Sequence, residues 1–191
     1  MKTLRRISII LLALFILNFA GDKVFPHSKI KTMKGETISS GKILNHKLTL
    51  INFWSTWCVP CKKEMKYLQE LHQKYAKDDF QVVGISIDDS KTVSRVPSII
   101  KSKKLSYPIF LDTDKSLYRK FHTSSVPFSV LVDQNGNIIW EHQGYTPGDE
   151  KLMEKQIFAF LNQKNHIKDL PKTKTLREKP QDKGRIQKAN G

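Results

Sequence analysis

Two apolar runs on either side of a helical pattern limit the architectures open to this chain of 191 residues. The first run is LTLINFW at 48–54, and the second is FQVVGISIDD at 80–89. Between them, residues recur at the three- and four-residue steps of one helix face, namely Cys61, Glu64, Leu68, Leu71 and Tyr75. A near-continuous apolar run is typical of a strand buried on both faces. We therefore expect a strand, a helix and a second strand in a covered sheet.

The segments on either side extend this unit to an α/β fold. The residues Asn135-Gly136 between two apolar runs are a strong hairpin signal. We expect a short hairpin around Gly35 and Gly41, a helix at 94–104, an extended piece at 107–111, helical turns at 116–121, strands at 128–132 and 137–141, and a helix at 148–161. This order predicts a central mixed sheet with helices on both faces and a C-terminal antiparallel hairpin.

The N-terminal segment, residues 1–21, has the layout of a targeting signal. Three basic residues precede the apolar run ISIILLALFILNFA at 7–20. This run lacks the polar face that an ordinary helix of a folded domain would have. The run is short for a membrane span of about 20 residues, and NFA at 18–20 fits a small-x-small cleavage site poorly. The sequence leaves open a cleaved signal peptide or a retained membrane anchor. Either predicts export to the periplasm or to the outer face of the cytoplasmic membrane.

The formal net charge of +15 is concentrated at the ends of the chain. Three positive charges lie in the N-terminal segment, and the tail at 164–191 has nine Lys or Arg against three acids. A net charge of +6 therefore remains for the residues between these two segments. We expect no nucleic-acid partner. The tail is predicted to be disordered and solvated, with contact to anionic lipid or an acidic partner as the alternative. Residues 22–29 are expected to be a polar connector before one domain at 30–163.

Both cysteines of the chain lie in WSTWCVPC at 54–61, three positions apart. Cys58 is expected at or just before the first helical turn, where unpaired N–H groups and the helix dipole lower a thiol pKa below about 8.5. Cys61, one turn later, is close enough to close a disulfide with Cys58 and to resolve a mixed disulfide. Pro60 begins the helix without losing an N–H that the helix needs. The spacing therefore favours a redox pair.

Three other interpretations of the cysteines fit less well. A structural zinc site needs about four ligands, and the chain has no second cysteine pair and no His-x₃₋₅-His cluster. A disulfide across four residues removes little chain entropy, so it would add little stability. A peroxidase would have Thr three residues before the cysteine and Pro four before that, where this chain has Ser55 and Ile51. We expect no metal and no cofactor.

These motifs resemble the thioredoxin superfamily and, within it, the exported TlpA-like thiol-disulfide oxidoreductases. The resemblance runs from about residue 30 to residue 161. It is carried by INFWSTWCVPCKKEM at 51–65, VVGISIDD at 82–89, SVPFSVLVDQNGNI at 125–138 and Gly144-Tyr145. It implies a thioredoxin-like fold and thiol–disulfide exchange with protein substrates, with Cys58 as nucleophile and Cys61 as resolving thiol.

The resemblance also implies roles for residues around the pair. Val126-Pro127 would be a cis-proline loop beside the cysteines, with Val126 offering backbone groups to a substrate; the alternative is a proline that merely begins a strand. Trp54 and Trp57 would shield the pair, although aromatic residues ahead of a helix are equally often core.

Glu64 stands on an otherwise apolar helix face, where a carboxylate is costly without a partner or a role. The role would be proton exchange with Cys61, with a pKa raised by burial, and TlpA-like proteins have glutamate here. The alternative is a first-turn acid favoured by the helix dipole. Asn52 replaces the buried aspartate of cytoplasmic thioredoxins, which leaves Glu64 as the proton acceptor.

The function that these residues predict is reduction of exported protein disulfides, for example in cytochrome c maturation, with electrons from a membrane donor. The Val-Pro dipeptide between the cysteines tunes the redox poise, so the direction of electron flow stays open. One alternative is a disulfide oxidase or isomerase with the same site. Another is a non-catalytic thioredoxin-like chaperone or binding module.

Overall fold

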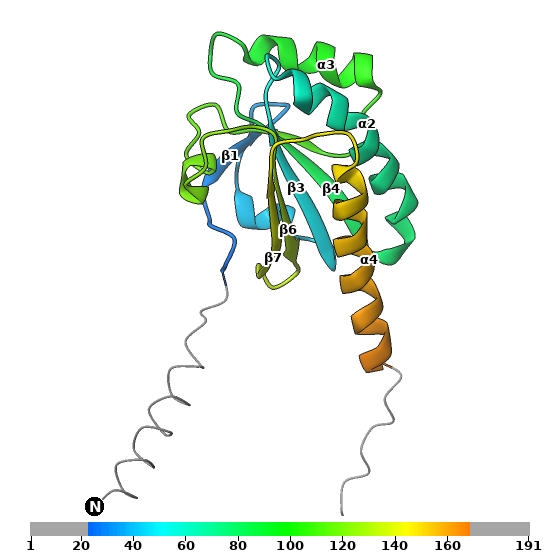
Figure 1. The fold of residues 1–191 in the computed structure, drawn as a ribbon. Coiled ribbons are helices and arrows are strands. Elements are labelled where there is room, and N and C mark those ends of the chain that lie inside the picture. Colours follow the sequence, from blue (N-terminus) through cyan, green and yellow to red (C-terminus); the bar gives the residue numbers. More distant parts are fainter. Residues whose placement is uncertain (1–22, 169–191) are drawn as a thin grey trace, which may run out of the picture.

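Strand β3 (Leu48–Trp54) is an inner strand, between β4 and β6, of a seven-stranded sheet with the order β2-β1-β5-β4-β3-β6-β7 (Figure 1). The computed structural model describes residues 23–168. The predicted run 48–54 is the observed strand, and all seven of its residues are buried. The other strands are β1 (Lys29–Thr32), β2 (Thr37–Ser39), β4 (Phe80–Ser86), β5 (Ile109–Leu111), β6 (Phe128–Asp133) and β7 (Ile138–Gln143).

The sheet is mixed, as predicted. Strand β3 pairs in parallel with β4 and antiparallel with β6, and β6 forms the predicted hairpin with β7. Two crossover helices, α2 (Val59–Lys74) and α3 (Val96–Lys103), connect the parallel neighbours β3, β4 and β5. A 3-10 turn, η3 (Val93–Arg95), leads into α3.

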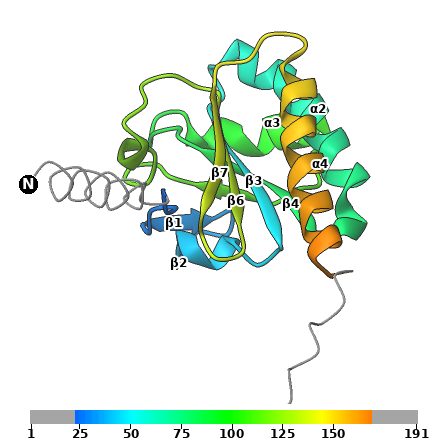
Figure 2. The ribbon, with the colours of Figure 1, turned by 60° about the horizontal axis from the view of Figure 1, so that its bottom comes forward.

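All three α-helices pack on one face of the sheet. Side chains from β3, such as Leu50, form one buried cluster with Leu68 of α2, Val96 of α3 and Ile157 of α4 (Asp149–Lys168). Figure 2 shows α2 and α4 beside each other along this face. Two right-handed crossovers that advance in the same direction across a sheet place their helices on the same side, and β3, β4 and β5 advance in that way.

The opposite face is covered without α-helices, which differs from the expected helices on both faces. Its cluster combines Ile51 and Phe53 of β3 with Phe25 of the N-terminal segment and Tyr118 of the 3-10 turn η4 (Tyr118–Phe121). A second 3-10 turn, η1 (Ser40–Ile43), adds to this layer. The α/β fold with two covered faces is therefore observed, but short turns and an extended segment form the second layer.

The boundaries of the domain differ from the predicted ones. Phe25 is only 1% exposed and its N–H donates to Gly136 O across 2.8 Å, so residues 23–29 belong to the domain and the predicted polar connector is wrong there. At the other end, α4 continues to Lys168, past its predicted end at 161 and past the predicted start of the tail at 164. A local composition window does not detect burial of one phenylalanine or the continuation of a helix through polar residues.

The remaining predictions for the ends of the chain, a signal or anchor at 1–21 and disorder at 169–191, lie outside the described residues. Among the helices of residues 23–168, none combines the length and the apolar character that a membrane crossing requires.

Candidate active site

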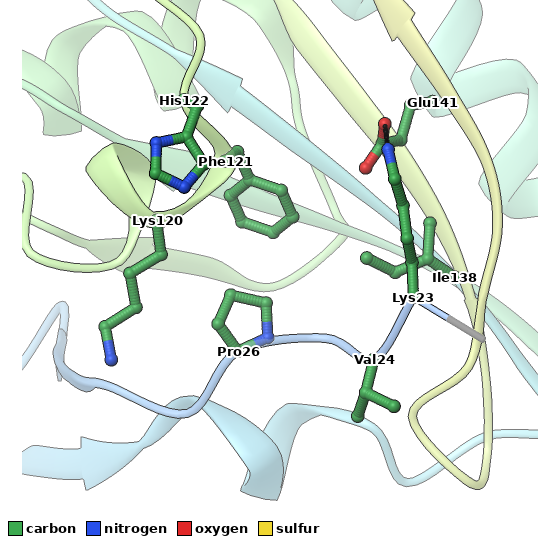
Figure 3. A pocket seen from close by; sticks show the side chains of 8 residues that line it. All are labelled: Lys23, Val24, Pro26, Lys120, Phe121, His122, Ile138 and Glu141. Carbon is green, nitrogen blue, oxygen red and sulfur yellow. Dashed lines mark hydrogen bonds and ion pairs between the residues drawn. The ribbon is translucent and has the colours of Figure 1, made fainter. Parts of the chain in front are cut away.

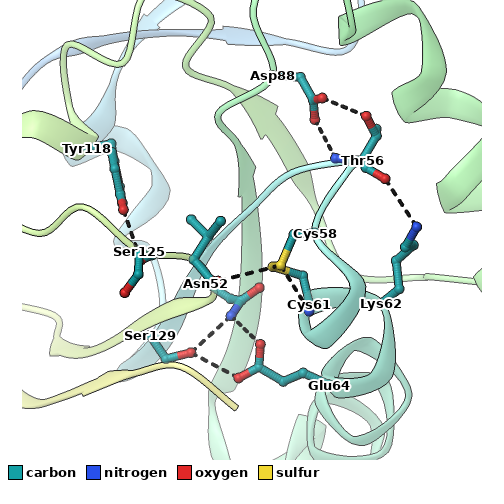
Figure 4. Close-up of a disulfide and its surroundings, with 11 residues drawn as sticks. Asn52, Thr56, Cys58, Cys61, Lys62, Glu64, Asp88, Tyr118, Ser125 and Ser129 are labelled. Atoms are coloured by element: carbon teal, nitrogen blue, oxygen red, sulfur yellow. Dashed lines mark hydrogen bonds between the residues drawn. A yellow bond between two sulfur atoms is a disulfide. The ribbon is translucent and has the colours of Figure 1, made fainter.

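Cys58 and Cys61 form a disulfide at the junction of β3 and α2 (Figure 4). Cys58 is the N-cap residue of α2, and its Sγ accepts the backbone N–H of Cys61 across 3.1 Å. Pro60 lies in the first turn of the helix, where its missing N–H leaves no bond unmade. Cys61 is fully buried and Cys58 is 4% exposed. The structure thus places the pair where the sequence predicted it.

Asp88 holds the loop that leads into Cys58. Its carboxylate accepts the N–H of Thr56 across 2.8 Å and the hydroxyl of Thr56 across 2.6 Å (Figure 4). It also accepts the Ser86 hydroxyl across 2.8 Å. Asp88 is completely buried just beyond β4. Because a buried carboxylate with several donors is held firmly in place, Asp88 fixes the backbone two residues before Cys58. Sequence reasoning missed this role and gave Asp88 only the end of a strand.

The Val126–Pro127 peptide bond is cis, as the resemblance implied. It lies beside the disulfide, with the Val126 carbonyl oxygen 3.5 Å from Cys58 Sγ. The residue ahead of it is tied to the second layer of the fold, because the Tyr118 hydroxyl donates to Ser125 O across 2.9 Å (Figure 4). The redox pair and the cis-proline loop, about 68 residues apart in sequence, therefore form one site.

Glu64 is completely buried beneath the disulfide and belongs to a polar trio with Asn52 and Ser129 (Figure 4). The Asn52 side-chain amide donates to Glu64 Oε2 across 2.8 Å and to Ser129 Oγ across 3.0 Å, and the Ser129 hydroxyl lies 3.5 Å from Glu64 Oε1. Asn52 and Ser129 are direct partners in the antiparallel pairing of β3 and β6. Sequence reasoning missed Ser129, although a serine inside an apolar strand is a signal of this kind.

Burial raises the pKa of Glu64 from 4.5 to about 8. The hydrogen bonds from Asn52 and Ser129 favour the carboxylate and act in the opposite direction, whereas the negative charge of Asp149 raises the pKa further. The Glu64 carboxyl is therefore protonated at neutral pH, and its pKa lies close to that of an ordinary thiol. A group with these properties can exchange a proton with a cysteine one helical turn away.

The two tryptophans occupy different environments. Trp54 is completely buried in the cluster that contains both cysteines. Trp57 is 56% exposed, and its shielding of the pair stays a prediction. Trp57 and Val59, which is 58% exposed, place apolar surface directly before and after Cys58.

A pocket of about 330 Å³ lies away from the cysteines, between the N-terminal segment, η4 and β7 (Figure 3). Val24, Phe121 and Ile138 line it with apolar surface. An ion pair borders it, in which Lys23 Nζ lies 2.9 Å from Glu141 Oε2. Within residues 23–168, no group of three or more histidine, cysteine, aspartate or glutamate side chains is placed to hold a metal ion.

A protein-family model described as Redoxin matches residues 19–157. The chain belongs to the redoxin family. This redoxin is 30% identical over 122 residues to the thiol-disulfide oxidoreductase ResA of Bacillus thuringiensis subsp. konkukian (strain 97-27), a match that covers 64% of this chain and 69% of the relative. The named relative and the cysteine pair together make this redoxin a protein thiol-disulfide oxidoreductase.

Solved structures confirm the thioredoxin-like fold of this redoxin. The crystal structure of StoA from Bacillus subtilis aligns with a TM-score of 0.56 and 29% identity, covering 70% of this chain and 98% of StoA. The solution structure of a thiol:disulfide interchange protein from Bacteroides sp. aligns with a TM-score of 0.61 and 23% identity, covering 75% of this chain and 91% of that protein. The second likeness concerns the fold alone.

Proposed function

We propose that this redoxin is an exported reductant that transfers two electrons to disulfides of client proteins through Cys58 and Cys61. The observation that carries the proposal is the position of Cys58 as the N-cap of α2, with Sγ accepting a helix N–H. Such N–H groups and the helix dipole favour a thiolate at this position. The cis-proline loop beside Cys58 supports a client that binds along the Val126 backbone.

The exchange balances in two displacement steps. The Cys58 thiolate attacks one sulfur of the client disulfide, which forms a mixed disulfide and releases the first client sulfur as a thiolate. The Cys61 thiolate then attacks Cys58 Sγ, which releases the second client sulfur and closes the Cys58–Cys61 disulfide. The client gains two electrons, and the redoxin is oxidised to the state in which the structure shows it.

Glu64 supplies the proton step of the second displacement in this proposal. Its carboxylate takes the proton of the Cys61 thiol, and the neutral carboxyl that results is the form favoured by burial next to the closed disulfide. When a donor reduces the disulfide again, Glu64 returns the proton to Cys61. A pKa of about 8 lets the carboxyl act in both directions near neutral pH.

The cellular setting is part of the same proposal. Residues 1–21 would direct export and could be kept as a membrane tether, which places the domain in the periplasm or at the outer face of the cytoplasmic membrane. A reductant there needs electrons from elsewhere, so we propose a membrane thiol donor. The proposed clients are exported thiol proteins, with cytochrome c maturation as the example that the family resemblance suggests.

Trapping of mixed disulfides tests the function. Cys61→Ser removes the resolving thiol, so this variant should accumulate covalent complexes with exported proteins, visible on non-reducing gels and lost on reduction. Cys58→Ser is the matched control and should trap none. A non-catalytic binding module would retain the same partners without a covalent bond in either variant, and that result would refute the exchange.

The redox potential decides between reductant and oxidant. Equilibrating residues 22–191 in graded thiol–disulfide buffers should change the fluorescence of Trp54, which is buried with the pair. A reductant should have a potential near the roughly −270 mV of thioredoxin, whereas a potential near the roughly −120 mV of DsbA would establish an oxidase instead.

A further inference from the structure

An open groove of about 540 Å³ runs along the solvent side of the first turns of α2, and we call it the lysine groove. Its lining includes four lysines and two tyrosines: Lys62, Lys63, Lys66, Lys103, Tyr67 and Tyr145. The rings of the two tyrosines lie 6.2 Å apart and form one wall. Neither the disulfide chemistry nor the proton role of Glu64 uses this surface.

Lysines outnumber the carboxylates at the groove, where Glu150 accepts the Tyr145 hydroxyl across 2.9 Å and Glu70 lies near Lys66. No carboxylate belongs to its lining. Lys66 lies 3.9 Å from Glu70 in an exposed pair, which is worth little in water, and the Lys62 ammonium donates to the uncharged Thr56 carbonyl. Among residues 23–168, Lys63 and Lys103 have no carboxylate within salt-bridge distance. The positive end of the α2 dipole adds to the same field.

The groove begins at the redox pair. Val59 follows Cys58 directly, lines the groove and is 58% exposed. Trp57 exposes a similar apolar surface on the preceding side. Because only 4% of Cys58 is accessible, a client sulfur reaches it only when the client chain contacts this rim. Val59 therefore connects this rim to the groove that the lysines line.

We infer that the lysine groove binds a client polypeptide that has aspartate or glutamate close to its reacting cysteine. The inference rests on the proposed function and names the class of client that it favours. The basic groove attracts acidic segments and repels basic ones, and Val59 and the tyrosine wall add apolar contact. An anionic lipid surface fits less well, because a membrane lying over this rim would cover Cys58.

Three disulfide peptides of one sequence test the inference, with two Asp, two Ser or two Lys residues beside the cysteine. The reduced protein is mixed with each peptide, and the second-order rate constant is followed by tryptophan fluorescence in a stopped-flow instrument. At low salt the Asp peptide should react about tenfold faster than the Ser peptide, and the Lys peptide slower than both. At about 0.5 M salt the three rates should converge.

Charge-reversal variants assign the effect to the groove. The triple variant Lys63→Glu/Lys66→Glu/Lys103→Glu should prefer the Lys peptide over the Asp peptide, whereas a neutral small disulfide such as 2-hydroxyethyl disulfide should react as with the parent protein. Lys62 is left unchanged because it contacts the Thr56 carbonyl. The control Lys34→Glu/Lys77→Glu/Lys155→Glu has the same overall net charge as the groove variant, but its three substitutions lie outside the groove. It should keep the preference for the Asp peptide.

Four results would overturn the inference. Equal peptide rates at low salt would exclude charge recognition and leave the proposed function intact. An equal slowing of the small disulfide by the groove variant would mean that the lysines act on the Cys58 thiol rather than on the client. Loss of binding to phosphatidylglycerol vesicles in the groove variant, with unchanged peptide rates, would assign the groove to lipid. A reduced protein that attacks none of the disulfides would overturn the proposed function and this inference with it.

Discussion

The side-chain amide of Asn52 donates to Glu64 Oε2 across 2.8 Å in the layer between the sheet and α2. A carboxyl group in an apolar layer costs free energy unless it is neutral or hydrogen-bonded. Glu64 meets both conditions, since burial keeps it protonated at neutral pH while Asn52 holds it in place. An ionised aspartate at position 52 would oppose the ionisation of Glu64, whereas the amide supports both protonation states.

Glu64→Gln should remove a pH dependence of stability. The pKa of Glu64 is raised from 4.5 to about 8, so between these values the folded chain holds a proton that the unfolded chain has lost. The stabilisation of the folded state by this proton is complete below pH 4.5 and is lost as pH rises to about 8. The free energy of unfolding changes by up to about 1.4 kcal/mol per pH unit in this range. Urea unfolding of the oxidised protein should show that the free energy of unfolding of the variant rises relative to that of the parent protein over this pH range.

Glu70→Gln is the matched control for this measurement, because Glu70 is an exposed glutamate on the same helix. Its stability curve should run parallel to that of the parent protein. Parallel curves for Glu64→Gln as well would mean that Glu64 is ionised in the folded protein throughout this range.

The same substitution should slow one chemical step and spare the other. Attack by Cys58 on a small disulfide does not use Glu64 and should keep its rate, whereas attack by Cys61 on the mixed disulfide should slow by about 100-fold, the lower end for loss of a general base. In the parent protein the second step should accelerate as pH rises toward 8, where Glu64 ionises. Single-turnover fluorescence separates the two phases, and equal slowing of both would indicate a structural role instead.

Asn52→Leu should raise the pKa of Glu64 above its value of about 8, because the amide hydrogen bond lowers it. Loss of the buried donor should also destabilise the protein at high pH by about 2 kcal/mol, since the ionised carboxylate then lacks its partner. NMR titration of ¹³C-labelled glutamate carboxyls would report the pKa directly. Ser129→Ala should shift it in the same direction but less, as its hydroxyl lies 3.5 Å away. A lowered pKa in either variant would contradict this account of the trio.

Asp88→Asn should loosen the loop that carries Cys58. The amide replaces one acceptor oxygen with an N–H₂ group that faces donors from Thr56 or Ser86. We expect a loss of about 2 kcal/mol in unfolding free energy and slower attack by Cys58, measured by urea unfolding and by thiol reactivity. Asp89→Asn changes an exposed neighbour and should leave thiol reactivity unchanged. Unchanged reactivity in Asp88→Asn would show that the loop holds its position without the carboxylate.

Local patterns in the sequence predicted the elements that local physics determines. The apolar run 48–54 alone was sufficient to predict strand β3. The helical spacing from Cys61 to Tyr75 predicted the buried face of α2. The Asn52–Ser129 contact joins residues 77 positions apart, so it depends on strand register rather than on any local pattern. The interaction of Asp88 with Thr56 has the same origin. Glu64 was found because a charge on an apolar helix face is itself a local anomaly.

The N-terminal boundary shows the limit of composition most clearly, and Phe25 provides its test. Residues 22–29 are mostly polar, yet Phe25 packs against Phe121 at 5.8 Å between ring centroids in the second layer of the fold. Phe25→Ala should therefore cost about 3 kcal/mol or more in unfolding free energy. Val24→Ala is the matched control, because Val24 is exposed and should change stability by less than about 0.5 kcal/mol. A chain shortened to begin at residue 30 should lose at least as much as Phe25→Ala, and equal stability of the two chain lengths would restore the predicted boundary.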